Sequence, residues 1–163
     1  MPRAHSKPRE LIVLPRRYAK RILLASFLMI PSGFAALWNG LMDNAFLNAL
    51  VFSTSVNYWR RPTLGWRRNV DMVCATGSLA YQLLHTSRRA SDQVRALYFG
   101  FVVLGGAFYL SARTLTFYYR DTWGDTAYNV SSAAHCCLHL CGNLGNLVLY
   151  GALGVSRTAS RAS

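Results

Sequence analysis

Long apolar stretches, separated by short polar connections, make up most of the chain. The first runs from Ile22 to about Met42, which suffices to cross a bilayer core of about 30 Å at a rise of about 1.5 Å per residue. Four further stretches follow, at about 43–59, 69–86, 94–119 and from 128 to about 155. The pattern predicts an all-α, polytopic transmembrane helical bundle of about five spans, with four and six as the limits of the count.

This layout divides the chain into three parts. Residues 1–21 are expected to form a basic cytoplasmic tail, residues 22–155 a single transmembrane helical domain, and residues 156–163 a short polar tail. Lysine and arginine residues support one orientation, because thirteen lie in the amino tail and the alternate loops on its side, and five on the opposite side. Pro31, followed by Ser32 and Gly33, predicts a kink in the first span.

Charge refines this picture. Lysine plus arginine number 18 against 6 aspartate plus glutamate, giving a formal charge of +12. The basic residues border the apolar stretches rather than lining exposed helix faces, so the expected partner is the lipid bilayer and not nucleic acid. The four cysteines lie within apolar segments and are expected to be small buried side chains.

No cleavable signal peptide is evident, so the first span is expected to act as an uncleaved anchor. This favours an integral protein of the endomembrane system. A mitochondrial membrane ranks second, because the leader is rich in arginine and nearly free of acids.

The last apolar stretch carries a polar stripe. Its members recur at three- and four-residue steps and therefore share one helix face. They are Ser131, Ser132, His135, His139, Gly142, Asn143, Asn146 and Tyr150. Polar groups at membrane depth are costly unless they face a protein interior, so the stripe is either a packing surface or a site. The small and amide residues of 142–146 favour packing against the third or fourth span.

Within the stripe, His135 and His139 are four residues apart and would reach one metal ion from a single helix face. Zinc needs a third ligand, which Asp71 or His85 of the third span could supply. Asp71 is the better partner, because the long last span can slide until the histidines approach the cytoplasmic end where Asp71 lies. A packing role for the histidines stays open, as does haem ligation by His85 and His139, which ranks lower.

The order of three motifs resembles the superfamily of alkaline ceramidases and progestin/adipoQ receptors, often called CREST. The second span ends in STSVNYW, the third opens with NVDM, and the last contains HCCLH. The resemblance implies zinc held by His135, His139 and Asp71, with Asp71 and Ser55 in the catalytic machinery and Ser55 polarising a water. The family's second-span histidine is replaced by Trp59, four residues after Ser55, or by Tyr58, four residues after Thr54, so one zinc ligand is missing. The family also has seven spans.

Two function classes follow. The first is a zinc-dependent intramembrane hydrolase acting on a lipid-amide substrate, and the second is a non-enzymatic membrane scaffold or assembly protein whose polar stripe only packs helices. Whether the chain is an enzyme stays open at the level of sequence.

Overall fold

The computed structural model describes residues 12–162, and every regular element in that range is a helix. A single antiparallel bridge between Ile12 and Thr63 is the only strand-like pairing there. The elements are α1 (Arg16–Ser26), α2 (Met29–Trp38), α3 (Met42–Trp59), α4 (Trp66–Tyr81), the π-helical turn η1 (Gln82–Thr86), the 3₁₀ turn η2 (Ser87–Arg89), α5 (Asp92–Tyr118), α6 (Arg120–Trp123) and α7 (Asp125–Ala162). The all-α prediction is therefore confirmed.

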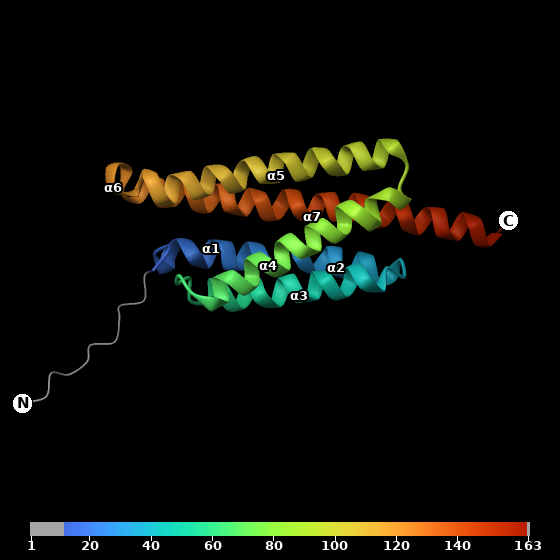
Figure 1. The fold of residues 1–163 in the computed structure, drawn as a ribbon, viewed down its shortest axis with the longest axis horizontal. Helices are drawn as coiled ribbons and strands as arrows, with labels where there is room; N and C mark the ends of the chain where they lie inside the picture. The colour runs from blue at the N-terminus through green and yellow to red at the C-terminus, as the bar shows by residue number, and fades with distance from the viewer. Residues whose placement is uncertain (1–11, 163) are drawn as a thin grey trace, which may run out of the picture.

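The helices form an elongated bundle whose long axis follows α5 and α7. These two run antiparallel and side by side, joined at one end by the short α6 (Figure 1). The α1–α2 pair lies along α7, α3 packs against α2, and α4 packs against α3 at an oblique angle (Figure 1). Gly124 makes the turn into α7 with a φ of 51°, a conformation that glycine adopts without steric cost.

Three helical segments are long and apolar enough to cross a membrane. They are Arg16–Trp38, Asp92–Tyr118 and Asp125–Ser156. Their outer faces expose large apolar side chains such as Phe34, Val103 and Leu110, each more than 60% accessible. A continuous apolar surface of this kind suits contact with lipid rather than water.

The other two expected spans form helices but are less apolar. In α3, Asn44 and Asn48 are buried and face the bundle interior, while Asp43 and Ser53 are exposed, so polar side chains occur on both sides of this helix. In α4, Arg67, Arg68 and Asp71 lie in the first two turns, and this helix gives way to a π-helical turn after Tyr81. The five predicted spans thus correspond to five helical segments, of which three have the length and apolarity of a membrane span.

The first span contains the break that Pro31 predicts. Proline lacks an N–H, and its ring collides with the carbonyl four residues earlier, here that of Phe27. Helix α1 accordingly ends at Ser26 and α2 begins at Met29, with short i→i−3 bonds between them. Helix α1 also begins at Arg16, six residues earlier than Ile22, so its first turns include four basic residues that the sequence placed in the tail. Residues 1–11 of that expected tail lie outside the described range.

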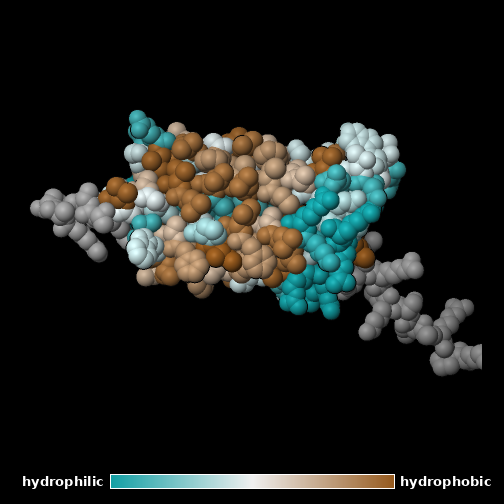
Figure 2. Space-filling model, turned by 180° about the vertical axis from the view of Figure 1, so that it is seen from behind, coloured by the Kyte–Doolittle hydropathy of each residue, from teal (hydrophilic) through white to brown (hydrophobic). Residues whose placement is uncertain are grey.

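Polar surface gathers at one end of the bundle. The start of α1, the α3–α4 loop and the start of α4 meet there (Figure 1). In the space-filling view, hydrophilic residues cover that end and an apolar band occupies most of the remaining length (Figure 2). The basic residues of α1, of the α3–α4 loop and of the start of α4 therefore lie at one end of the bundle.

Candidate functional site

A cavity of about 420 Å³ runs along the interior face of α4, α5 and α7. It exists because α4 packs along α3 while α5 packs along α7, leaving space between the two pairs. Most of the exposed surface of its wall is apolar, and polar or ionisable side chains contribute the remainder. These are Asn48, Ser55, Tyr58, Arg68, Asp71, Thr76, Ser78, Gln82, Tyr98, Tyr109, Arg113, Thr116, Ser131, His135, His139, Asn143 and Asn146.

The charged groups of the cavity lie toward the basic end of the bundle. Arg68 and Asp71 belong to the first turns of α4, and Arg113 lies near the end of the antiparallel α5. Further along, the wall combines apolar side chains such as Leu79 and Val102 with uncharged polar ones such as Ser78 and Gln82. The cavity is therefore charged at one end and uncharged along the rest of its length.

The polar stripe of α7 faces the bundle interior, and several of its members bind other helices. Ser131 lies 2.6 Å from the hydroxyl of Thr116 and donates to the carbonyl oxygen of Ala112 over 2.9 Å, both on α5. The Tyr150 hydroxyl accepts a 2.8 Å hydrogen bond from Gln82 of η1. These contacts support a packing role for the two ends of the stripe.

A second buried network joins three helices near the middle of the stripe. Ser32 of α2 donates to the side-chain oxygen of Asn143 over 2.6 Å and accepts from Asn48 of α3 over 2.9 Å. Asn143 also donates to the carbonyl of His139, one turn earlier, over 2.7 Å. All three side chains at the centre of this network are buried. The network holds α2, α3 and α7 in register.

His135 and His139 differ from the rest of the stripe. Their ring centroids are 5.3 Å apart, and the His135 ring stands edge-on to Trp59 of α3 at 4.8 Å. The Nε2 atom of His139 is the one buried side-chain nitrogen or oxygen without a hydrogen-bond partner in the described part of the chain. Buried polar atoms in native proteins almost always have a partner, so this nitrogen is available to a bound molecule.

Asp71 lines the same cavity as the histidine pair. Its carboxylate accepts a 3.1 Å hydrogen bond from the hydroxyl of Thr54 on α3. The hydroxyl of Ser55, the neighbouring residue, is buried and lies 3.1 Å from that of Ser26 on α1. The structure thus brings four sequence-predicted residues, His135, His139, Asp71 and Ser55, to one cavity.

These residues do not assemble a complete metal site as they stand. Among the described residues, no group of three or more His, Cys, Asp or Glu side chains is close enough to hold one ion. Two adjacent imidazoles and an unpartnered nitrogen provide part of a zinc donor set, and the third ligand is not in place. His85 is exposed, stacks on Tyr81 at 5.1 Å and is not among the residues that line the cavity.

Two contributors to the site are not evident from the sequence alone. Trp59 was read as the replacement of a ligand, whereas it packs against His135. Thr54 orients the Asp71 carboxylate from a neighbouring helix. Both lie on α3, Thr54 directly before Ser55 and Trp59 one helical turn after it. Their contacts with Asp71 of α4 and His135 of α7 depend on how these helices pack, which the sequence of α3 does not show.

No protein-family model, curated protein or solved structure matches this chain.

Proposed function

We propose that this protein is a five-span integral membrane protein that binds an amphipathic, lipid-type molecule in the cavity between α4 and α5. The observation that carries the proposal is the distribution of charge in the cavity, which has charged groups at the basic end and an uncharged, mostly apolar wall beyond them. A lipid has the same division into a polar head and an apolar chain. Residues of α3 and α7 form further parts of the cavity wall.

In this arrangement, the polar head faces Arg68, Asp71 and Arg113. The apolar chain lies along the wall formed by residues such as Leu79 and Val102. The free Nε2 atom of His139 offers a hydrogen bond to a carbonyl or hydroxyl near the head of the lipid. Binding in such a site draws mainly on burial of the apolar chain, while a small number of polar groups set its orientation.

Gly106 on α5 allows the proposal to be tested with a single substitution. It lines the cavity, and a Cβ atom added there would meet no heavy atom within 4 Å. A Cβ atom at this position therefore displaces no neighbour, and Gly106→Leu is expected to occupy cavity space. Displacing about four methylene groups of a bound chain, at about 0.8 kcal/mol each, weakens binding about two hundredfold.

Gly100→Leu is the matched control. Gly100 lies on the same helix, its added Cβ also meets nothing within 4 Å, and it does not line the cavity. Lipid retained by the full chain after detergent purification would be counted by native mass spectrometry. We expect one retained lipid in wild type and Gly100→Leu and little in Gly106→Leu. Equal retention in the two variants, or none in wild type, would contradict the proposal.

A zinc-dependent lipid-amide hydrolase is the second candidate function. It is supported by the presence of His135, His139 and Asp71 around one cavity and by the unpartnered His139 nitrogen. For Asp71 to become the third zinc ligand, its carboxylate would have to release the hydroxyl of Thr54 and approach the histidines. Otherwise another group would have to supply the third ligand. When bound, zinc would supply an activated water for attack on the amide carbonyl.

Elemental analysis separates the two candidates. A hydrolase predicts about one zinc per chain in purified wild type and loss of zinc, with the fold retained, in His135→Ala and His139→Ala. Sub-stoichiometric zinc in the wild type would rule out the metal-dependent hydrolase and leave lipid binding without catalysis. Loss of stability without any metal to lose would instead assign the pair to helix packing.

A further inference from the structure

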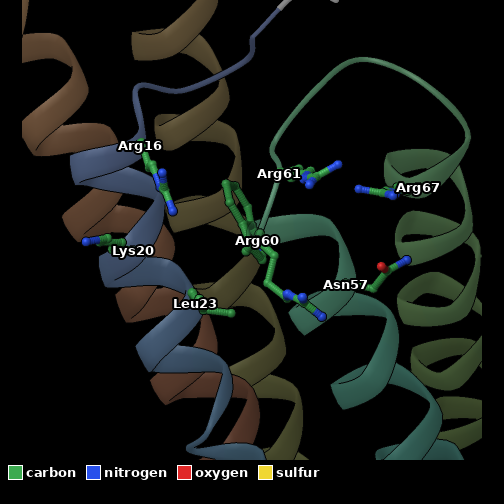
Figure 3. A pocket seen from close by; sticks show the side chains of 8 residues that line it. Arg16, Lys20, Leu23, Asn57, Arg60, Arg61 and Arg67 are labelled. Carbon is green, nitrogen blue, oxygen red and sulfur yellow. The ribbon is translucent and has the colours of Figure 1, made fainter.

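A second pocket, of about 460 Å³, opens at the basic end of the bundle on the side of α1 and α3. Five cationic side chains line it, from three separate segments: Arg16 and Lys20 on α1, Arg60 and Arg61 after α3, and Arg67 on α4. Figure 3 shows these side chains around the opening, with Arg61 and Arg67 extending toward one another. This basic pocket is distinct from the cavity described above, although Trp59 borders both.

The chain fold brings these cations together. Arg16 and Lys20 are four residues apart and occupy one face of α1. The backbone N–H of Val13 donates to the carbonyl of Pro62 over 2.8 Å, which fixes the α3–α4 loop beside the segment that leads into α1. The loop therefore holds Arg60 and Arg61 next to α1, and the pocket is a feature of the folded chain.

The charges of the basic pocket have no acidic partner within the described residues. The ion pairs found there join Arg17 to Asp125, Arg95 to Asp92, and Arg120 to Asp121, and none involves a cation of the pocket. No aspartate or glutamate is among the residues that line it. Like charges held this close repel one another, so the arrangement favours a bound anion.

The position of the basic pocket identifies the anion. Its inner wall includes the apolar side chains of Leu23 and Trp59. Nearby, Trp66 and Leu64 are exposed to 66% and 42%, as expected of side chains at the level of lipid headgroups. Guanidinium groups bind phosphate oxygens through paired hydrogen bonds, and a lipid presents its phosphate directly beside an apolar phase.

We propose that the basic pocket binds the phosphate of an anionic membrane-lipid headgroup. A terminal phosphate monoester carries more charge than the phosphodiester of a zwitterionic lipid, and suits a pocket lined by five cations better. Such a lipid, bound in the headgroup layer, would anchor α1, the α3–α4 loop and α4 to one leaflet. This proposal does not depend on a molecule in the interior cavity.

Two double variants, each removing two adjacent arginines, test the assignment. Arg60→Gln with Arg61→Gln removes two cations of the pocket, whereas Arg88→Gln with Arg89→Gln removes two exposed cations at the opposite end of the bundle. The full chain in detergent would be titrated with dioctanoyl phosphatidic acid and, separately, with dioctanoyl phosphatidylcholine. Native mass spectrometry would measure the affinity, with inorganic phosphate as a soluble competitor.

We expect the pocket variant to bind phosphatidic acid about tenfold more weakly or worse, since it loses charge-assisted hydrogen bonds, and the control to bind like wild type. Lys20→Gln, which removes a pocket cation from a different element, should also weaken binding. It provides the test if the double variant folds poorly. An equal loss of affinity for phosphatidic acid in both double variants would overturn the proposal, because the lipid would then be attracted by the overall positive charge of the protein. Equal affinity for phosphatidylcholine would also overturn it, and efficient displacement by inorganic phosphate would identify a free anion as the ligand.

Discussion

Ser32 is the residue whose removal should most clearly reveal how the bundle is held together. Its hydroxyl is fully buried and joins Asn48 of α3 to Asn143 of α7. Ser32→Ala removes both interhelical hydrogen bonds and leaves two buried amide groups without that partner. Interhelical hydrogen bonds in membranes contribute about 0.6 kcal/mol on average and about 1.7 kcal/mol at most, so the substitution should lower the free energy of unfolding by about 1–3 kcal/mol.

Ser53→Ala is the matched control for this prediction. The Ser53 hydroxyl is exposed on α3 and bonds to the carbonyl of Ala49 in its own helix, over 2.8 Å. Its loss should change the free energy of unfolding by less than about 0.5 kcal/mol. Both variants would be unfolded from mixed micelles by increasing the mole fraction of sodium dodecyl sulfate, with circular dichroism as the readout. If Ser32→Ala were no less stable than Ser53→Ala, the buried network would not be a determinant of the fold.

Three further substitutions probe the packing of α7. Gly145→Ala should lower the free energy of unfolding by about 1–3 kcal/mol, because its Cβ would lie 3.1 Å from the Cβ of Phe101. Gly142→Ala is the control, because its Cβ would meet nothing within 4 Å, and it should leave the free energy of unfolding unchanged in the same assay. Tyr150→Phe removes the acceptor of the 2.8 Å bond from Gln82 and should lower the thermal midpoint, and a midpoint equal to that of wild type would argue against this contact.

The sequence was sufficient to predict the helices and much of their layout. Apolar stretches gave five helical segments close to the observed ones, because a bilayer requires about 20 apolar residues per span and excludes other backbone structure. The break caused by Pro31 also followed from local chemistry, since the clash of its ring with a preceding carbonyl does not depend on tertiary contacts.

The boundaries of the first helix were harder to predict. Arginine and lysine at positions 16–21 were assigned to the tail on charge alone. In the structure they form the first turns of α1, where Tyr18 and Ala19 are buried while the cations stay exposed. Long basic side chains can remain at the surface of a helix whose other face is packed, so charge did not mark the end of the helix.

The candidate site was predictable only in part. The spacing of His135 and His139 placed them on one helix face. Of the two residues expected as a third ligand, Asp71 borders the same cavity as the histidines and His85 does not, and the ligand role of Asp71 stays a prediction. The cavity itself depends on the angle at which α4 leaves α3, and the basic pocket depends on how the α3–α4 loop meets α1. Both depend on how helices distant in the sequence pack together, which the spacing of residues along one helix does not determine.

Mapping where a lipid contacts the protein would test the central claim most directly. The full chain, in detergent with one photoactivatable acyl-chain lipid per protein, would be crosslinked and its peptides analysed by mass spectrometry. Binding in the interior cavity predicts crosslinks on the inward faces of α4 and α5, at residues such as Leu79 and Val102. Crosslinks confined to the outer surface, around residues such as Phe34 and Phe46, would contradict it.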